Sequence, residues 1–143
     1  MDFKKISQKL SEQYSKKIAV NALFPNNIGV IPNFDAKGKF ASINGEFVEF
    51  YLKLEQGYII NASFIAKAGS LTIASASLLT SMCQGLKLNH ALKHVNLDVL
   101  LEEIPEISEN EQFKVLTAYE AYRKAVISGF SISRNSWKKF YAR

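Results

Sequence analysis

One cysteine and two histidines are the side chains of this chain best suited to nucleophilic or metal chemistry. Cys83 comes near the end of an apolar helical pattern, and His90 and His94 follow it four residues apart. A nucleophilic cysteine needs a nearby base, and histidines at this spacing share one helix face, as two metal ligands do. No carboxylate is spaced as a third ligand, and a cysteine within an amphipathic helix is usually a small core residue. We therefore predict neither a catalytic pair nor a metal site from these three residues alone.

Other enzyme signatures are missing from the sequence. The glycines between residues 29 and 45 do not have the spacing of a dinucleotide or P-loop fingerprint. The serine-rich segment 70–81 has no Gly-x-Ser-x-Gly elbow, and the acidic segment 102–111 lacks the ligand spacing of a calcium loop. A single cysteine also excludes an internal disulfide and a cysteine-rich metal site within one chain. We predict that the chain is not an enzyme.

The composition is that of an ordinary globular domain. The chain has 143 residues, 48% of them hydrophobic, and no apolar run approaches the roughly 20 residues that cross a bilayer. The first five residues are not followed by the apolar core of a signal peptide, so we expect a cytoplasmic protein without membrane contact. The formal charge of +5 is concentrated in basic residues near both ends. Without a zinc-finger or aromatic RNA-binding pattern beside them, we do not predict nucleic-acid binding.

The apolar pattern changes along the chain from helical to strand-like. Residues 2–19 carry apolar side chains every three or four positions, which predicts a first helix, and the turn formers of 21–34 predict a loop. Three strands are predicted at 39–44, 46–54 and 58–67, because aromatic and β-branched residues alternate there between hairpin turns. In the second strand the even positions, from Val48 to Leu54, are expected to face the core.

Helices are predicted for the rest of the chain. The first runs from Leu71 to about Gly85, with Ser70 as its N-cap residue. The others are expected at 89–95, 97–104, 111–129 and 133–141. The fold class is therefore α+β, a small three-stranded antiparallel sheet with helices packed mainly on one face.

Two short segments carry a resemblance to a known family. Pro25–Gly29, with the sequence Pro-Asn-Asn-Ile-Gly, resembles the Asn-Pro-x-Asn-x-Gly loop of the U-type iron–sulfur cluster assembly scaffolds, the IscU/NifU/SufU family. Residues 73–80, Ile-Ala-Ser-Ala-Ser-Leu-Leu-Thr, resemble the Ala-Ser-x-Ser helix of that family. The resemblance extends from about Tyr14 to Phe130. It implies one domain over residues 1–143, in which 131–143 form a basic C-terminal extension.

The resemblance also implies a metal site, and this chain departs from it. Family scaffolds hold an iron–sulfur cluster or zinc with three cysteines and an aspartate, because soft metal centres select thiolates. The positions that align with this site are Asn44 for the first cysteine, Glu46 for the aspartate, Gly69 for the second cysteine, and Phe113 and Lys114 for a histidine and the third cysteine. All three thiolates are missing. We therefore predict no bound cofactor.

Two further expectations concern this altered site. Cys83 comes about fourteen residues after Gly69, which on a helix is on the order of 20 Å, so it cannot replace a lost ligand. Lys114 would place an ammonium where a metal ion should bind. If Lys114 lies near Glu46, the former site becomes an ion pair.

The function implied by the resemblance is a protein-binding or regulatory role in iron–sulfur cluster assembly, without holding the cluster. The expected partner is a cysteine desulfurase or another assembly protein. In the family the N-terminal helix and the loops around the ligands contact the desulfurase. The corresponding segments of this chain are Phe3–Ile18, Pro25–Gly29 and the neighbourhood of Asn44. Phe3 and Trp137 are candidate anchors. The residues predicted to contact a partner are Phe3, Tyr14, Pro25, Asn27 and Gly29.

Two alternatives stay open at the level of sequence. The chain could be a scaffold that holds a metal with Glu46, His90 and His94, or with ligands from another chain. It could also be a domain with no remaining link to iron–sulfur assembly.

Overall fold

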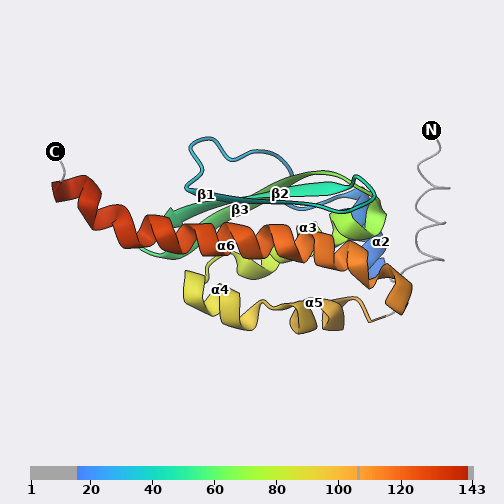
Figure 1. The fold of residues 1–143 in the computed structure, drawn as a ribbon. Helices are drawn as coiled ribbons and strands as arrows, with labels where there is room; N and C mark the ends of the chain where they lie inside the picture. Colours follow the sequence, from blue (N-terminus) through green and yellow to red (C-terminus); the bar gives the residue numbers. More distant parts are fainter. Residues whose placement is uncertain (1–15, 106, 142–143) are drawn as a thin grey trace.

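The computed structural model describes residues 16–105 and 107–141 of the chain, with side chains up to Ile132. The elements are α2 (Lys16–Leu23), β1 (Ala36–Ala41), β2 (Phe47–Glu55), β3 (Tyr58–Lys67), α3 (Ser70–Cys83), α4 (Leu88–His94), α5 (Leu97–Glu103), the short 3₁₀ helix η1 (Glu109–Glu111) and α6 (Gln112–Tyr141). The sheet lies on one side of α6, and α4 and α5 lie on the other side (Figure 1). The predicted α+β class is confirmed. Phe3, Tyr14 and most of the predicted first helix fall outside the described residues.

The sheet has the strand order β1-β2-β3 and is antiparallel throughout. In its centre Phe50 lies opposite Gly38 on β1 and Phe64 on β3. Val48, Phe50 and Leu52 are fully buried, as the alternation predicts, whereas Leu54 is half-buried next to a register shift. The first strand ends at Ala41 rather than at 44. The reason is that residues 42–46 form the turn, closed by a hydrogen bond from the Ser42 N–H to the Glu46 carbonyl (2.7 Å).

The loop that follows α2 pairs with the outer edge of β3 and, through Phe34, partly covers the second face of the sheet. The Gly29 N–H donates to the Phe64 carbonyl (2.8 Å), and the Ser63 hydroxyl donates to the Gly29 carbonyl (2.6 Å). The ring of Phe34 packs on Tyr51, which is only 5% exposed although it points away from the helices. Burial, together with the neighbouring Glu49 carboxylate, raises the pKa of Tyr51 to about 12. The burial of Tyr51 on the opposite face of β2 is a feature that the alternation did not predict.

Three helix boundaries differ from the predicted ones. α3 begins at Ser70 and its N-cap residue is Gly69, so the prediction of Ser70 as the N-cap is wrong. α2 continues to Leu23, beyond the expected start of the loop. α6 is one helix of 30 residues through Gly129, where a break was predicted. Gly129 packs against the side chains of Leu88 and Leu54, and this tertiary packing outweighs the low helix propensity of glycine.

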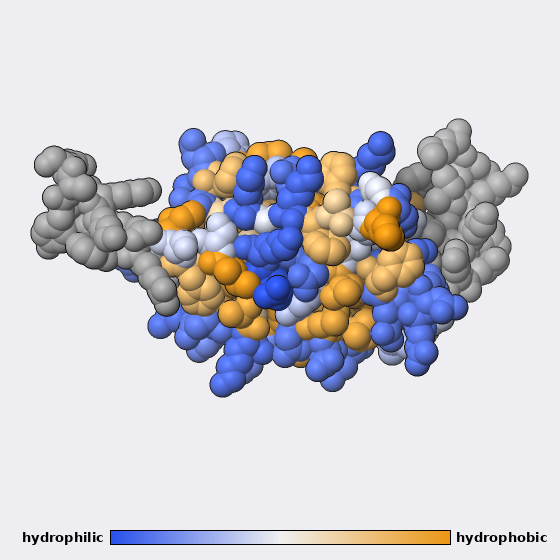
Figure 2. Space-filling model, in the orientation of Figure 1, coloured by the Kyte–Doolittle hydropathy of each residue, from blue (hydrophilic) through white to orange (hydrophobic). Residues whose placement is uncertain are grey.

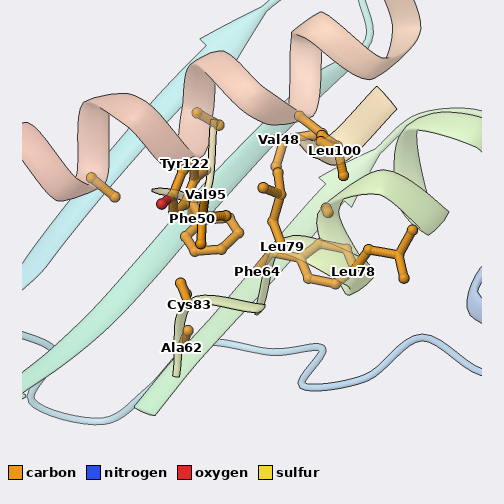
Figure 3. Packing of buried hydrophobic residues seen from close by; sticks show 14 of the residues in the cluster. Val48, Phe50, Ala62, Phe64, Leu78, Leu79, Cys83, Val95, Leu100 and Tyr122 are labelled. Atoms are coloured by element: carbon orange, nitrogen blue, oxygen red, sulfur yellow. The ribbon is translucent and has the colours of Figure 1, made fainter. Parts of the chain in front are cut away.

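The hydrophobic core lies between the sheet, α3 and α6 (Figure 3). The rings of Phe50 and Tyr122 meet edge to face with centroids 5.5 Å apart, and the Tyr122 hydroxyl donates to the Ala91 carbonyl (2.8 Å). This bond joins α6 to α4 without leaving a buried hydroxyl unpaired. Within the described part of the chain, no helix is long and apolar enough to cross a membrane.

Candidate functional site

The turn after β1, the start of α3 and the start of α6 lie at the same end of the molecule (Figure 1). β1 and β3 are both antiparallel to β2, so the turn that follows β1 and the helix that follows β3 come at the same end of the sheet. We call Asn44, Glu46, Gly69, Phe113 and Lys114 the ligand positions. The fold therefore brings the ligand positions, which are far apart in the sequence, to the same end of the molecule.

The carboxylate of Glu46 connects the β1–β2 turn to α3. Its Oε1 accepts a hydrogen bond from the Gly69 N–H (3.1 Å), and its Oε2 accepts one from the Thr72 hydroxyl (3.2 Å). The side chain of Asn44 supports it, since Asn44 Oδ1 accepts from the Glu46 N–H (3.3 Å). The ligand positions Asn44, Glu46 and Gly69 are thus joined. Thr72 is an additional member that sequence reasoning missed.

Lys114 does not enter this arrangement. It is half-buried, and its ammonium lies 6.0 Å from the centre of the Phe113 ring. The four ion pairs among the described side chains do not include Glu46 with Lys114, so the expected ion pair is not formed. Both oxygens of Glu46 are already engaged by Gly69 and Thr72.

The ligand positions do not fit an iron–sulfur cluster or a zinc ion. They offer an amide, a hydrogen-bonded carboxylate and an ammonium, whereas these centres select thiolate and imidazole. No group of three or more His, Cys, Asp or Glu side chains that could hold a metal ion exists among the described residues. His90 and His94 are exposed on α4, with ring centres 5.7 Å apart. The alternative site of Glu46, His90 and His94 is therefore not formed within this chain.

Cys83 is part of the core. Its side chain is 0% exposed, and burial raises the pKa of the thiol to about 12. It ends α3, whereas Gly69 precedes the first residue of that helix. A buried, protonated thiol is neither a nucleophile nor a ligand, so Cys83 does not compensate for the missing cysteines.

The two segments that carry the family resemblance contact each other. The Asn26 N–H donates to the Ser77 hydroxyl (2.8 Å), and the Asn27 side-chain amide donates to the Thr80 hydroxyl (3.1 Å). The Ser77 hydroxyl in turn donates to the side-chain oxygen of Asn21 on α2 (2.6 Å). We call these residues the Asn–Ser network. It fixes the loop to α3 and gives Asn27 a role within the chain.

The other two loop residues predicted to contact a partner are Gly29 and Pro25, and neither is fully exposed. Gly29 pairs with β3 and has a φ of 127°, a conformation that favours glycine. Pro25 is half-buried. The serine and threonine residues within an otherwise apolar helix are the sequence signal for this network, because polar groups buried in a helix require partners.

We expect Ser77→Ala to lower the free energy of unfolding by about 2 kcal/mol, because it removes two hydrogen bonds of a fully buried hydroxyl. Urea unfolding followed by circular dichroism measures this change. Ser81→Ala is the matched control, since Ser81 is exposed and accepts one hydrogen bond from the Asn26 side chain (3.2 Å). Equal losses in the two variants would contradict a structural role for the Asn–Ser network.

Large apolar side chains are exposed near the ligand positions. Ile43 in the β1–β2 turn is 107% exposed, and Phe113 and Leu116 in the first turns of α6 are 45% and 38% exposed. We call these three residues the Ile43–Leu116 surface. Figure 2 shows apolar groups alternating with hydrophilic ones across the α6 side of the molecule. Sequence reasoning did not single out Ile43, because nothing in the local pattern distinguishes an exposed isoleucine in a turn from a buried one.

Known proteins agree with this fold and with the resemblance. The family described as the NifU-like N terminal domain matches residues 13–134. The chain belongs to this family. The iron–sulfur cluster assembly scaffold protein IscU 1 of Archaeoglobus fulgidus is 25% identical over 118 residues, which are 82% of this chain and 76% of that protein. The nitrogen fixation protein NifU of Azotobacter chroococcum is 34% identical over 89 residues, or 60% of this chain and 29% of that protein.

Solved structures show the same fold. The N-terminal part of a NifU-like protein from Brucella abortus superposes with a TM-score of 0.66 at 20% identity, covering 82% of this chain and 94% of that one. An iron–sulfur cluster assembly scaffold for the SUF system from Fervidobacterium islandicum gives a TM-score of 0.56 at 18% identity, covering 85% and 93%. The predicted membership of the U-type scaffold family is confirmed. Within this NifU-like family, the present chain has one cysteine, and that cysteine is buried.

Proposed function

We propose that this chain takes part in iron–sulfur cluster assembly by binding another assembly protein, such as a cysteine desulfurase, and that it does not hold the cluster. The observation that carries the proposal is the state of the ligand positions: no thiolate is present there, and the one carboxylate is hydrogen-bonded to Gly69 and Thr72. In this proposal residues 1–143 act as one domain in the cytoplasm, without catalysis and without a resident metal.

The Ile43–Leu116 surface supports a protein-binding role. Exposed apolar side chains grouped near one end of a domain are typical of contact sites, and large apolar anchors carry much of the energy of an interface. Ile43 projects from a turn in which every residue from 42 to 45 is at least partly exposed. A partner that docks on this end would cover Ile43 and Phe113 together with the ligand positions.

The proposal is tested by calorimetric titration of the chain with the cysteine desulfurase of the same organism, and by elemental analysis of the chain as purified. We expect binding, and less than a stoichiometric amount of iron or zinc. Phe113→Asp should weaken binding at least tenfold, because about 1.4 kcal/mol of contact energy is lost at an apolar anchor. Ile127→Asp is the matched control, since Ile127 is 43% exposed on the same helix further from the ligand positions.

Two results would overturn the proposal. One is stoichiometric iron or zinc that is lost in Glu46→Ala, including metal held between two copies of the chain. The other is the absence of binding both to the desulfurase and to the other iron–sulfur assembly proteins of the same organism. Equal loss of binding in Phe113→Asp and Ile127→Asp would show that the Ile43–Leu116 surface is not the contact site.

A further inference from the structure

The β1–β2 turn has little apolar packing to hold it in place. Ile43, Asn44 and Gly45 are exposed, and Ser42 and Glu46 are half-buried. Gly69, at the start of α3, is exposed as well. Segments with few buried contacts usually open locally with a small free energy. The contact between this turn and α3 therefore depends on polar interactions.

The start of α3 has no side chain of its own to bind its free backbone groups. Its N-cap residue is Gly69, which makes no side-chain hydrogen bond, and its first turn contains no acidic residue. A negative charge near a helix N-terminus is stabilising, because the helix dipole is positive there. Glu46, at the end of the β1–β2 turn, places its negative charge next to this helix N-terminus and bonds to Gly69 and Thr72.

The position of Glu46 is itself fixed by the turn. Its N–H donates to Asn44 Oδ1 (3.3 Å), its carbonyl accepts from the Ser42 N–H (2.7 Å), and the Gly45 N–H donates to the Ser42 carbonyl (3.0 Å). A methyl group added at Gly69 would lie 3.4 Å from Glu46 Oε1, which is ordinary contact distance. The carboxylate thus lies between the turn and the helix, with one oxygen bonded to Gly69 and the other to Thr72.

We propose that Glu46 is a metal-independent tie between the β1–β2 turn and α3, which keeps this end of the molecule ordered without a bound ion. A metal held by both segments would join them through coordination bonds. In this chain the two hydrogen bonds of Glu46 make the same connection, and Lys114 is left outside it. The surface that includes Ile43 is then presented in one arrangement whatever the supply of metal. The tie does not depend on the identity of any partner, so it can fail or hold independently of the proposed function.

The test is amide hydrogen exchange measured by NMR on the full-length protein. We expect Glu46→Ala to speed exchange at Ser42, Gly45, Gly69 and Ile73 roughly tenfold, as for the loss of a helix cap. Exchange at Phe64, whose N–H donates to Asn27, should stay unchanged and shows that the variant is folded. Thr72→Val removes only one of the two bonds, so its effect should be in the same direction and smaller.

Glu55→Ala is the matched control, since Glu55 is an exposed carboxylate at the other end of β2. It should leave exchange at the four amides unchanged. In the wild-type protein, a chelator or added zinc should also leave them unchanged. Equal exchange in Glu46→Ala and the wild type, or slower wild-type exchange on addition of zinc, would overturn the proposal.

Discussion

Replacing Asn44, Gly69 and Lys114 with cysteine should create a zinc site that binds one ion per chain. Three thiolates and the Glu46 carboxylate supply the tetrahedral ligand set that zinc favours. Gly69 accepts a side chain, because its φ is −75° and the nearest atom to an added methyl group is Glu46 Oε1 at 3.4 Å. With free zinc about a thousandfold above the dissociation constant, the free energy of unfolding should rise by about 4 kcal/mol. Elemental analysis and thermal unfolding with and without zinc measure both effects.

The matched control replaces the same three residues with alanine. It removes the native amide and ammonium equally but supplies no thiolate, so zinc should leave its unfolding unchanged. Variants with two of the three cysteines should bind zinc more weakly. If the three-cysteine variant binds no more zinc than the alanine control, the three positions do not converge on one metal, and the assignment of the ligand positions is wrong.

Gly38→Ala should lower the free energy of unfolding by about 3 kcal/mol, the upper range for overpacking a core. A methyl group at Gly38 would lie 2.3 Å from the Ala121 carbonyl oxygen and 2.3 Å from the Ala125 nitrogen, both backbone atoms of α6. β1 and α6 must therefore move apart, which also loosens the packing around Tyr122. Thermal unfolding should show a fall in Tm of roughly 10 °C for a chain of this size.

Gly129→Ala is the comparison for Gly38→Ala. Its methyl group would meet the tips of the Leu88 and Leu54 side chains at 2.9 and 3.2 Å, and these can shift. Alanine also gains about 1 kcal/mol over glycine within a helix. The net change should stay within about 1 kcal/mol. A smaller loss for Gly38→Ala than for Gly129→Ala would contradict the close backbone contact of β1 with α6.

Much of the fold could be predicted from the chain itself. The alternation of Val48, Phe50 and Leu52 indicated the buried face of β2, and the turn signals placed the hairpins within a few residues. The features that the sequence did not predict are those in which a second element determines the burial or the length of the first. Tyr51 is buried because the loop residue Phe34 covers it, and α6 continues through Gly129 because tertiary packing outweighs its low helix propensity.

The candidate site shows the same division. The order of segments was enough to predict the family and to propose the ligand positions, and none of these positions is a cysteine. The expected ion pair between Glu46 and Lys114 was wrong, because spacing along a chain does not say which of several polar groups an acid will reach. Thr72 and the Gly69 N–H lie within hydrogen-bonding distance of Glu46.

By itself the sequence determined the family, the fold class and the absence of cysteine ligands, since these follow from residue types and from patterns read within one segment. Only the tertiary structure decided what Glu46 does. Its role depends on the distance in space between the turn after β1 and the start of α3. Glu46 and Gly69, which meet there, are 23 residues apart in the sequence. Such distances are set by the packing of the sheet against the helices, and local sequence carries no direct record of them.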